Sequence, residues 1–167
     1  RLGTPNTPDL VARPLRPYRL VLCASPSYLK ANGSPKKPED LRSHQCLTYA
    51  YPPRSELRAA QPEWLLSLHD AHVSVPVGGR LKIDSAAALR KAVLAGLGIA
   101  MLPSILVEAD IKEKRLARVL PRYAPPARPL NLLYLRDRRM SPKLRSFIEF
   151  VMERFGPVSS RREASSR

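Results

Sequence analysis

The sequence lacks a hydrophobic run long enough to cross a membrane. Its most apolar window, residues 92–107, is interrupted by two glycines and by Pro103, whereas a membrane-spanning helix needs about 20 mostly apolar residues. Hydrophobic residues make up 44% of the 167-residue chain, which is ordinary for a globular protein. We therefore expect one core of fair size or two small ones, and no membrane partner.

Cysteine is scarce. Cys23 and Cys46 are the two cysteines of the chain, and each lies within an apolar, strand-like segment. A disulfide framework, a zinc site or a nucleophilic site needs partners that are missing, because there is no C-x-x-C pair and His44 is the only histidine nearby. We expect two buried free thiols in a reducing compartment. A redox role remains an alternative, since the two strands could be neighbours in a sheet.

Sets of catalytic or metal-binding residues are also missing. No Ser-His-Asp order, activated thiol or pair of carboxylates in a plausible pocket can be recognised. His44, His69 and His72 do not have a spacing typical of metal ligands, and the H-D-A-H stretch reads as an exposed turn. The sequence therefore predicts neither an enzyme nor a bound metal or other cofactor.

Acidic residues are few: 14 Asp and Glu face 29 Lys and Arg, and the net charge is +15. A basic chain invites a nucleic-acid interpretation. Here, however, the basic residues are scattered singly or in pairs between apolar segments, without aromatic residues among them. We expect a solvated basic surface, and keep a nucleic-acid-binding module as an alternative.

Residues 84–103, DSAAALRKAVLAGLGIAMLP, form the clearest unit of the chain. Asp84 or Ser85 can cap a helix, since a short side-chain oxygen accepts the first free amide protons. The apolar residues that follow have a helical period, and Gly96 suits a left-handed C-terminal stop. The run IAML then reads as a buried strand that ends at Pro103.

Other segments alternate between strand-like and helix-like patterns. Strands are predicted at residues 18–24, 46–50, 64–68, 73–77, 116–120 and 131–135. Residues 9–15 read as a short extended piece, which Pro14 excludes as a regular central strand. Short helices are predicted after Ser25, near Pro38 and after Ser104, with Ser104 as the cap. The longest helix starts at Ser141-Pro142 and ends at Gly156. Its apolar stripe consists of Leu144, Phe147, Ile148, Val151, Met152 and Phe155. This alternation favours an α/β fold with a largely parallel sheet.

Five stretches, taken in order, carry a resemblance to a known family. They are LVARPLRPYRLVLCASPSYL, PEDLRSHQCLTY, DSAAALRKAVLAGLGIAMLPSILV, RLARVLP and the helix SPKLRSFIEFV. In order, spacing and chemistry they resemble the effector-binding domain of LysR-type transcriptional regulators, over about residues 1–156. No stretch specifies the family alone. The Gly-x-Gly at Gly96, for example, follows a helix, whereas a dinucleotide-binding loop follows a strand.

The resemblance implies an α/β fold like that of type 2 periplasmic binding proteins: two α/β subdomains, two crossing strands and a small-molecule cleft between the subdomains. We expect residues 1–15 to end the first subdomain and residues 16–130 to form a complete second one, with hinge strands at its ends. Residues 131–156 would return to the first subdomain as a strand and a helix. Residues 157–167 read as a disordered polar tail.

Two parts that the family has are not found in this sequence: the winged helix-turn-helix and the first half of the first subdomain. The resemblance therefore implies a truncated regulator. The stripe of the last helix would thus lose part of its cover, although each large side chain is worth about 1.5–3 kcal/mol when buried. We expect the stripe to pack against a neighbouring chain or against preceding chain, or to be poorly ordered.

Four residues are the candidate effector contacts of the implied cleft. The helix that begins near Asp84 would direct free amides into it, which favours an anionic or polar ligand, and Ser85 would add a hydroxyl. Helix capping is the alternative role of both, and the charge of Asp84 would repel a carboxylate. Tyr49 and Tyr51 lie where related proteins place cleft-lining residues, and would supply an aromatic wall and hydroxyls. Ordinary packing is their alternative.

The resemblance implies a sensor that performs no reaction. An effector in the cleft would favour one of two relative positions of the subdomains, and this preference would be coupled to DNA binding. We expect a cytoplasmic homodimer or homotetramer that reaches DNA through a winged helix-turn-helix outside this chain, with the helix at residues 85–95 in the subunit interface. A periplasmic solute-binding protein of a transport system is the alternative. Two features argue against the periplasmic alternative. The cysteines are expected to be buried and free, and the sequence starts partway through the expected fold.

Overall fold

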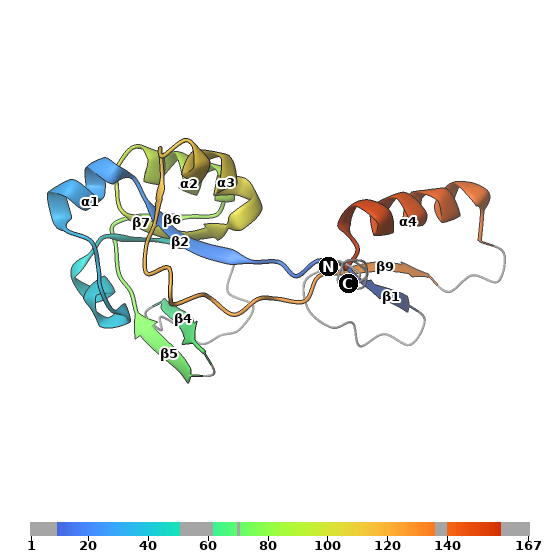
Figure 1. Ribbon diagram of the computed structural model, residues 1–167, viewed down its shortest axis with the longest axis horizontal. Helices are drawn as coiled ribbons and strands as arrows, with labels where there is room; N and C mark the ends of the chain where they lie inside the picture. The colour runs from blue at the N-terminus through green and yellow to red at the C-terminus, as the bar shows by residue number, and fades with distance from the viewer. Residues whose placement is uncertain (1–9, 51–61, 70, 136–139, 158–167) are drawn as a thin grey trace, which may run out of the picture. The chain divides into compact units, whose positions relative to one another are not determined.

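A computed structural model describes residues 10–50, 62–69, 71–135 and 140–157 of the chain. The chain divides into two compact units, residues 19–126 and residues 1–18 together with 127–167. Figure 1 shows the helices and strands of each unit. The predicted site residue Tyr51, the predicted loop at residues 51–58 and the predicted tail after Pro157 lie outside the described residues.

The larger unit is built on a five-stranded sheet with the order β6-β3-β7-β2-β8. The strands are β2 (Leu20–Ala24), β3 (Cys46–Tyr49), β6 (Lys82–Ile83), β7 (Ile99–Pro103) and β8 (Ala117–Arg118). β3 runs parallel to β6 and β7, whereas β2 runs antiparallel to β7 and β8. The expected largely parallel sheet is therefore wrong for β2. Alternation of strand-like and helix-like segments predicts which elements form. It does not predict the direction in which each strand runs in the sheet.

Both faces of this sheet are covered. On one face lie α2 (Ala86–Leu94) and α3 (Ser104–Lys112). On the other lies the antiparallel hairpin of β4 (Glu63–Leu68) and β5 (Ala71–Pro76) (Figure 1). The helix α1 (Pro26–Asn32) and the 3-10 helix η1 (Pro38–Ser43) belong to the same side, since Tyr28 and Leu41 share the buried cluster of the hairpin. Each layer buries its own apolar cluster against the sheet. The largest members are Leu47, Leu89, Leu102 and Leu116 under the two long helices, and Leu22, Leu41, Trp64 and Leu66 on the hairpin side.

Local signals in the sequence place most of these elements correctly. Residues 84–103 form α2, a turn with Gly96 at φ +78°, and β7. The Ser25 hydroxyl caps α1 by accepting the N–H of Tyr28. Two predictions are wrong. Ser104 is the first residue of α3 and not its cap, because β7 leads directly into the helix through Pro103. The strand expected at residues 116–120 is only two residues long, because Leu120 turns the chain with φ +49°.

The two cysteines are buried free thiols, as predicted. They lie on β2 and β3, which are separated by β7, so their strands are about 10 Å apart and too distant for a disulfide. Burial raises the pKa of both Cys23 and Cys46 to about 12. Neither thiol is a reactive thiolate near neutral pH.

The smaller unit pairs β1 (Leu10–Pro14) antiparallel with β9 (Asn131–Leu135) and adds α4 (Pro142–Phe155). The pairing continues beyond the strands, since the Leu15 N–H donates to the Leu130 carbonyl at 2.8 Å. Arg16 binds the end of α4: its backbone N–H donates to the Phe155 carbonyl at 2.8 Å and its Nε to the Gly156 carbonyl at 3.2 Å. The last helix is thereby fixed to the segment that precedes β2.

The small unit leaves much of α4 uncovered. Of the predicted stripe, only Ile148 is fully buried, while Phe147 and Phe155 are 57% and 43% exposed. Phe150, outside the predicted stripe, is 55% exposed. One two-stranded sheet is too small to cover a helix with so wide an apolar arc. That further chain packs on this face stays a prediction.

Gly98 gives a direct test of the central pairing. A Cβ atom at Gly98 would lie 2.2 Å from the backbone oxygen of Gln45, which accepts the Ile99 N–H at 2.8 Å. We expect Gly98→Ala to lower the free energy of unfolding by about 1–3 kcal/mol or more, measured by urea denaturation. Gly78→Ala is the matched control, because a Cβ there meets nothing within 4 Å. Equal stability of the two variants would contradict the close approach.

The apolar face of α4 gives a second test. Replacing Phe147 and Phe150 together with Ser should leave the helical circular dichroism unchanged but reduce binding of the dye anilinonaphthalene sulfonate, since the dye binds exposed apolar patches. Ile105→Ser is the control, because Ile105 is a single exposed side chain at the start of α3. Unchanged dye binding in the double variant would show that this face is covered in solution.

Candidate functional site

The carboxyl ends of three strands meet at one edge of the larger sheet. β3, β6 and β7 run in the same direction, and α2 and α3 start shortly after β6 and β7. In α/β proteins, ligands bind outside the carboxyl ends of parallel strands. This edge is therefore where the geometry allows a small-molecule site.

Tyr49 lies at this edge, beside the strand that leads into α2. It is the register partner of Ile83, and the next residue, Ala50, donates its N–H to the Ile83 carbonyl at 2.9 Å. The Tyr49 side chain is 41% exposed. Tyr49 is thus partly accessible next to the segment that carries Asp84 and Ser85.

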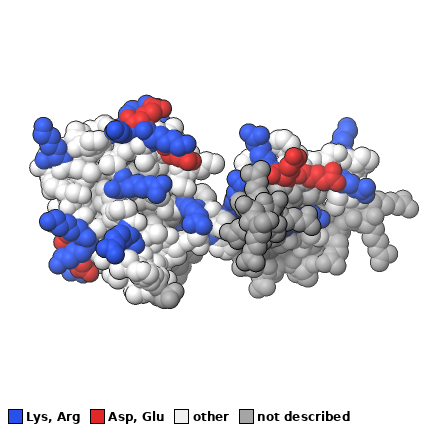
Figure 2. All heavy atoms as spheres, viewed as in Figure 1, with Lys and Arg blue, Asp and Glu red and all other residues white. Residues whose placement is uncertain are grey.

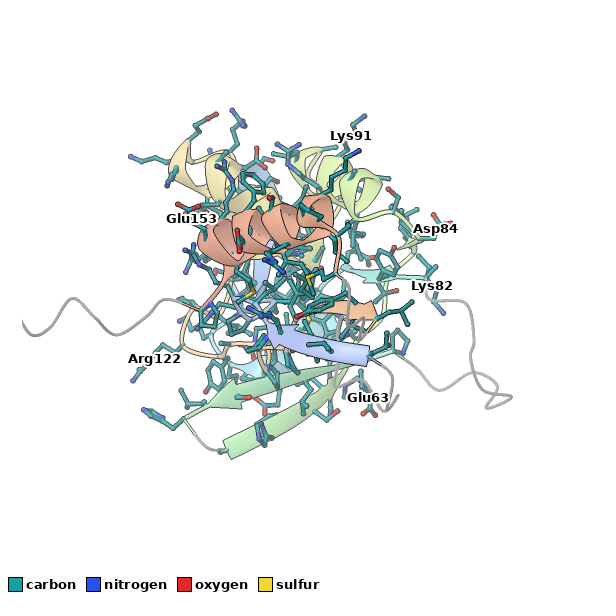
Figure 3. All side chains as sticks on the ribbon, turned by 90° about the vertical axis from the view of Figure 1, so that its right-hand side faces the viewer. Glu63, Lys82, Asp84, Lys91, Arg122 and Glu153 are labelled. Carbon is teal, nitrogen blue, oxygen red and sulfur yellow. The ribbon has the colours of Figure 1, made fainter. Side chains whose placement is uncertain are left out.

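Ser85 is the cap of α2, with an extended backbone and its hydroxyl accepting the Ala88 N–H at 3.4 Å. Capping, the alternative role considered for Ser85, is therefore present, and it occupies one acceptor position of the hydroxyl. Asp84 does not cap the helix. Its side chain is exposed on the same side of the unit as Lys82 (Figure 3). It therefore places a negative charge just before the first turn of α2.

The structure brings two further features to this edge that sequence reasoning missed. Leu20 pairs with Pro103, and the Ser104 N–H donates to the Arg19 carbonyl at 3.0 Å. The start of α3 and the exposed residue Arg19 therefore lie at the same end of the sheet. No local pattern could have shown this, because it depends on the antiparallel pairing of β2 with β7.

An ion cluster around one buried carboxylate joins α2 and α3. The Asp110 carboxylate is fully buried and binds the guanidinium groups of Arg90 and Arg115, the closest contact being 2.5 Å from Arg90 Nε. Hydrogen bonds from Arg90, and then from Arg115, hold the pKa of Asp110 below its usual value although burial acts in the opposite direction. The buried carboxylate is therefore ionised at neutral pH, and half-exposed Arg115 also pairs with the exposed carboxylate of Glu113.

The histidines do not form a site. His44 is buried, and its Nδ1 lies 3.2 Å from the Tyr28 hydroxyl. His69 is exposed in the hairpin turn, and His72 bonds to Ser67 on the hairpin surface. Within the described ranges no group of three or more His, Cys, Asp or Glu side chains is arranged to hold a metal ion.

The basic residues on the visible face are dispersed (Figure 2). On the face seen in Figure 2, Lys and Arg side chains cover the larger unit as separate groups, with acidic side chains beside some of them. The visible surface therefore offers no single basic groove for a nucleic acid.

Among the described helices, none is long and apolar enough to cross a membrane.

Comparison with known proteins identifies the family. The sequence profile of the LysR substrate binding domain matches residues 1–156. The HTH-type transcriptional activator AaeR of Escherichia coli is 32% identical over 158 residues, which cover 95% of this chain and 49% of AaeR. The HTH-type transcriptional regulator YhjC of Escherichia coli is 32% identical over 157 residues, covering 90% of this chain and 49% of YhjC. The chain thus spans about half the length of these relatives.

Solved structures agree with the sequence match. The regulatory domain of CrgA, a LysR-type transcriptional regulator from Neisseria meningitidis, superposes with a TM-score of 0.75 at 30% identity, covering 92% of this chain and 72% of that domain. The full-length virulence activator AphB of Vibrio cholerae superposes with a TM-score of 0.78 at 28% identity, covering 92% of this chain and 50% of AphB. This chain therefore belongs to the LysR substrate-binding domain family, the effector-binding domains of LysR-type transcriptional regulators, and has their type 2 periplasmic-binding-protein-like α/β fold.

Proposed function

We propose that this chain binds a small effector at the edge formed by Tyr49, Asp84 and Ser85, with Tyr51 as a further contact. The observation that carries the proposal is the parallel register of β3 and β6, which sets Tyr49 beside the first turn of α2. Free amides at the start of α2 favour a polar or anionic group on the ligand. The charge of Asp84 disfavours a carboxylate close to it, so the anionic group, if present, lies nearer the Tyr49 side.

The effector acts by shifting an equilibrium and not by being converted. In this proposal the chain carries parts of two subdomains of a hinged clamp, with residues 16–130, hinge segments included, forming the complete subdomain. An effector that binds one relative position of the subdomains more tightly shifts the population towards that position. The shift is passed to a winged helix-turn-helix outside this chain and changes how a homodimer or homotetramer binds DNA. The exposed side of α2 takes part in the subunit interface.

The relatives support this assignment over the rivals. AaeR and YhjC are named as HTH-type transcriptional regulators, which supports a cytoplasmic DNA-binding protein without enzymatic activity. They give no support to a periplasmic solute-binding protein of a transport system. Buried thiols that are free in the described chain suit the reducing cytoplasm.

Site substitutions test the effector contacts. A metabolite library is first screened by thermal shift against the intact protein, since a ligand that binds only the folded state raises its melting temperature. We then expect Tyr49→Phe and Ser85→Ala each to weaken the binding of a hit by about 3- to 30-fold, corresponding to the loss of one hydrogen bond. Isothermal titration calorimetry measures the affinity.

Ser27→Ala is the matched control for these variants. Ser27 is an exposed serine of α1, which follows the carboxyl end of β2 and therefore lies at the opposite edge of the sheet. Its substitution should leave the affinity unchanged. Unchanged affinity in both Tyr49→Phe and Ser85→Ala would remove these residues from the site.

A DNA titration separates the sensor from a nucleic-acid-binding module. The 167-residue chain is titrated into labelled duplex DNA at two salt concentrations, with binding followed by fluorescence anisotropy. We expect no binding at about 150 mM salt and only weak, salt-sensitive binding below it, since scattered charges release few counterions. Tight binding by this chain alone at the higher salt would favour the module.

A further inference from the structure

Asp110 is a buried, charged residue of α3 that is not among the proposed effector contacts. Among the described residues it is the one acidic side chain that is fully buried. Its Oδ2 accepts from Arg90 Nε at 2.5 Å, and its Oδ1 accepts from Arg90 Nη2 at 2.7 Å and from Arg115 Nη2 at 2.7 Å. A buried charge with this many directional contacts holds its partners in one geometry, because any shift leaves a desolvated charge uncompensated.

The contacts of Asp110 join three elements of the larger unit. Arg90 belongs to α2, and Asp110 itself to α3. Arg115 and Leu116 lead into β8, and both donate their backbone N–H to the Asp110 carbonyl, at 2.9 and 3.1 Å. One residue therefore fixes α2 against α3 and against the start of an edge strand of the sheet.

This cluster restrains α2 through Arg90. Arg90 lies five residues after Ser85, on the same helix, so movement of Arg90 moves the first turn that faces Tyr49. The contacts of α2 with the sheet are apolar, through Leu89 and Val93, and its first turn follows β6 after two residues. Apolar contacts are non-directional and permit small slides and rotations, whereas a bidentate guanidinium–carboxylate pair does not.

We propose that Asp110 is a positioning residue of the effector site, which sets the first turn of α2 and its cap Ser85 at the edge that carries Tyr49. The inference rests on the proposed function, because it assigns Asp110 a role in an effector site at this edge. The placement of α2 can nevertheless be measured without any effector.

Spin-label distances test the proposal in the full chain. Labels at Lys91→Cys on α2 and Glu63→Cys on β4 report how α2 sits across the sheet, since these residues lie at opposite ends of the larger unit (Figure 3). The native thiols are buried and their pKa is raised to about 12, so the labels react at the introduced cysteines. We expect Asp110→Asn to shift or broaden the distance distribution by several ångströms under conditions where the protein remains folded.

Glu108→Gln is the matched control. It removes the charge of another acidic residue of α3, whose pair with Lys112 at 3.6 Å is exposed, and should leave the distribution unchanged. Arg90→Lys is the second variant in case Asp110→Asn fails to fold. It keeps the positive charge but loses the two-pronged geometry, and we expect it to broaden the distribution in the same direction.

The outcomes separate this inference from the proposed function. A cluster that only adds stability would lower the unfolding midpoint and leave the distances of the folded protein unchanged. That result in folded Asp110→Asn or Arg90→Lys would overturn the inference. Altered distances, together with unchanged ligand affinity in the Tyr49 and Ser85 variants, would support positioning by Asp110 and reject the proposed site.

Discussion

The parallel pairing of β3 with its two neighbours is the constraint on which the larger unit depends. It brings the carboxyl ends of β3, β6 and β7 to one edge, and with them Tyr49 and the start of α2. The pairing requires the chain before β7 to pass close to the backbone of Gln45, which a side chain at Gly98 would prevent. A position without a Cβ atom is thus needed for the sheet, and the candidate site follows from the sheet.

Charge has two different roles in this protein. Most Lys and Arg side chains are dispersed on the surface (Figure 2), where exposed charges contribute little to stability. Around Asp110 two arginines form directional bonds to one buried carboxylate, and these join two helices and an edge strand. A high net charge therefore says little about function here, whereas the placement of one carboxylate bears on the geometry of the candidate site.

Local predictions succeeded where the signal is itself local. Ser25 and Ser141 cap their helices, and Gly96 adopts the left-handed conformation after α2, because capping and backbone freedom depend on a few consecutive residues. The expected cap at Ser104 failed because β7 runs into α3 without a linker. The candidate contacts came from a family resemblance. Of these, Tyr49, Asp84 and Ser85 are brought to one edge by the fold.

The sequence by itself determined the helices, most strands, the burial of the two cysteines and the family, since these depend on periodicity, composition and the order of motifs. Only the tertiary structure decided that β7 lies between β2 and β3, that β2 runs antiparallel, and that Arg90 and Arg115 meet at Asp110. Arg90 and Asp110 are 20 residues apart on different helices, and residues as distant in sequence as Cys23 and Arg118 pair in the sheet. Which distant segments meet depends on how the whole unit packs. A short window of sequence contains only one side of each such contact, so it cannot predict the partner.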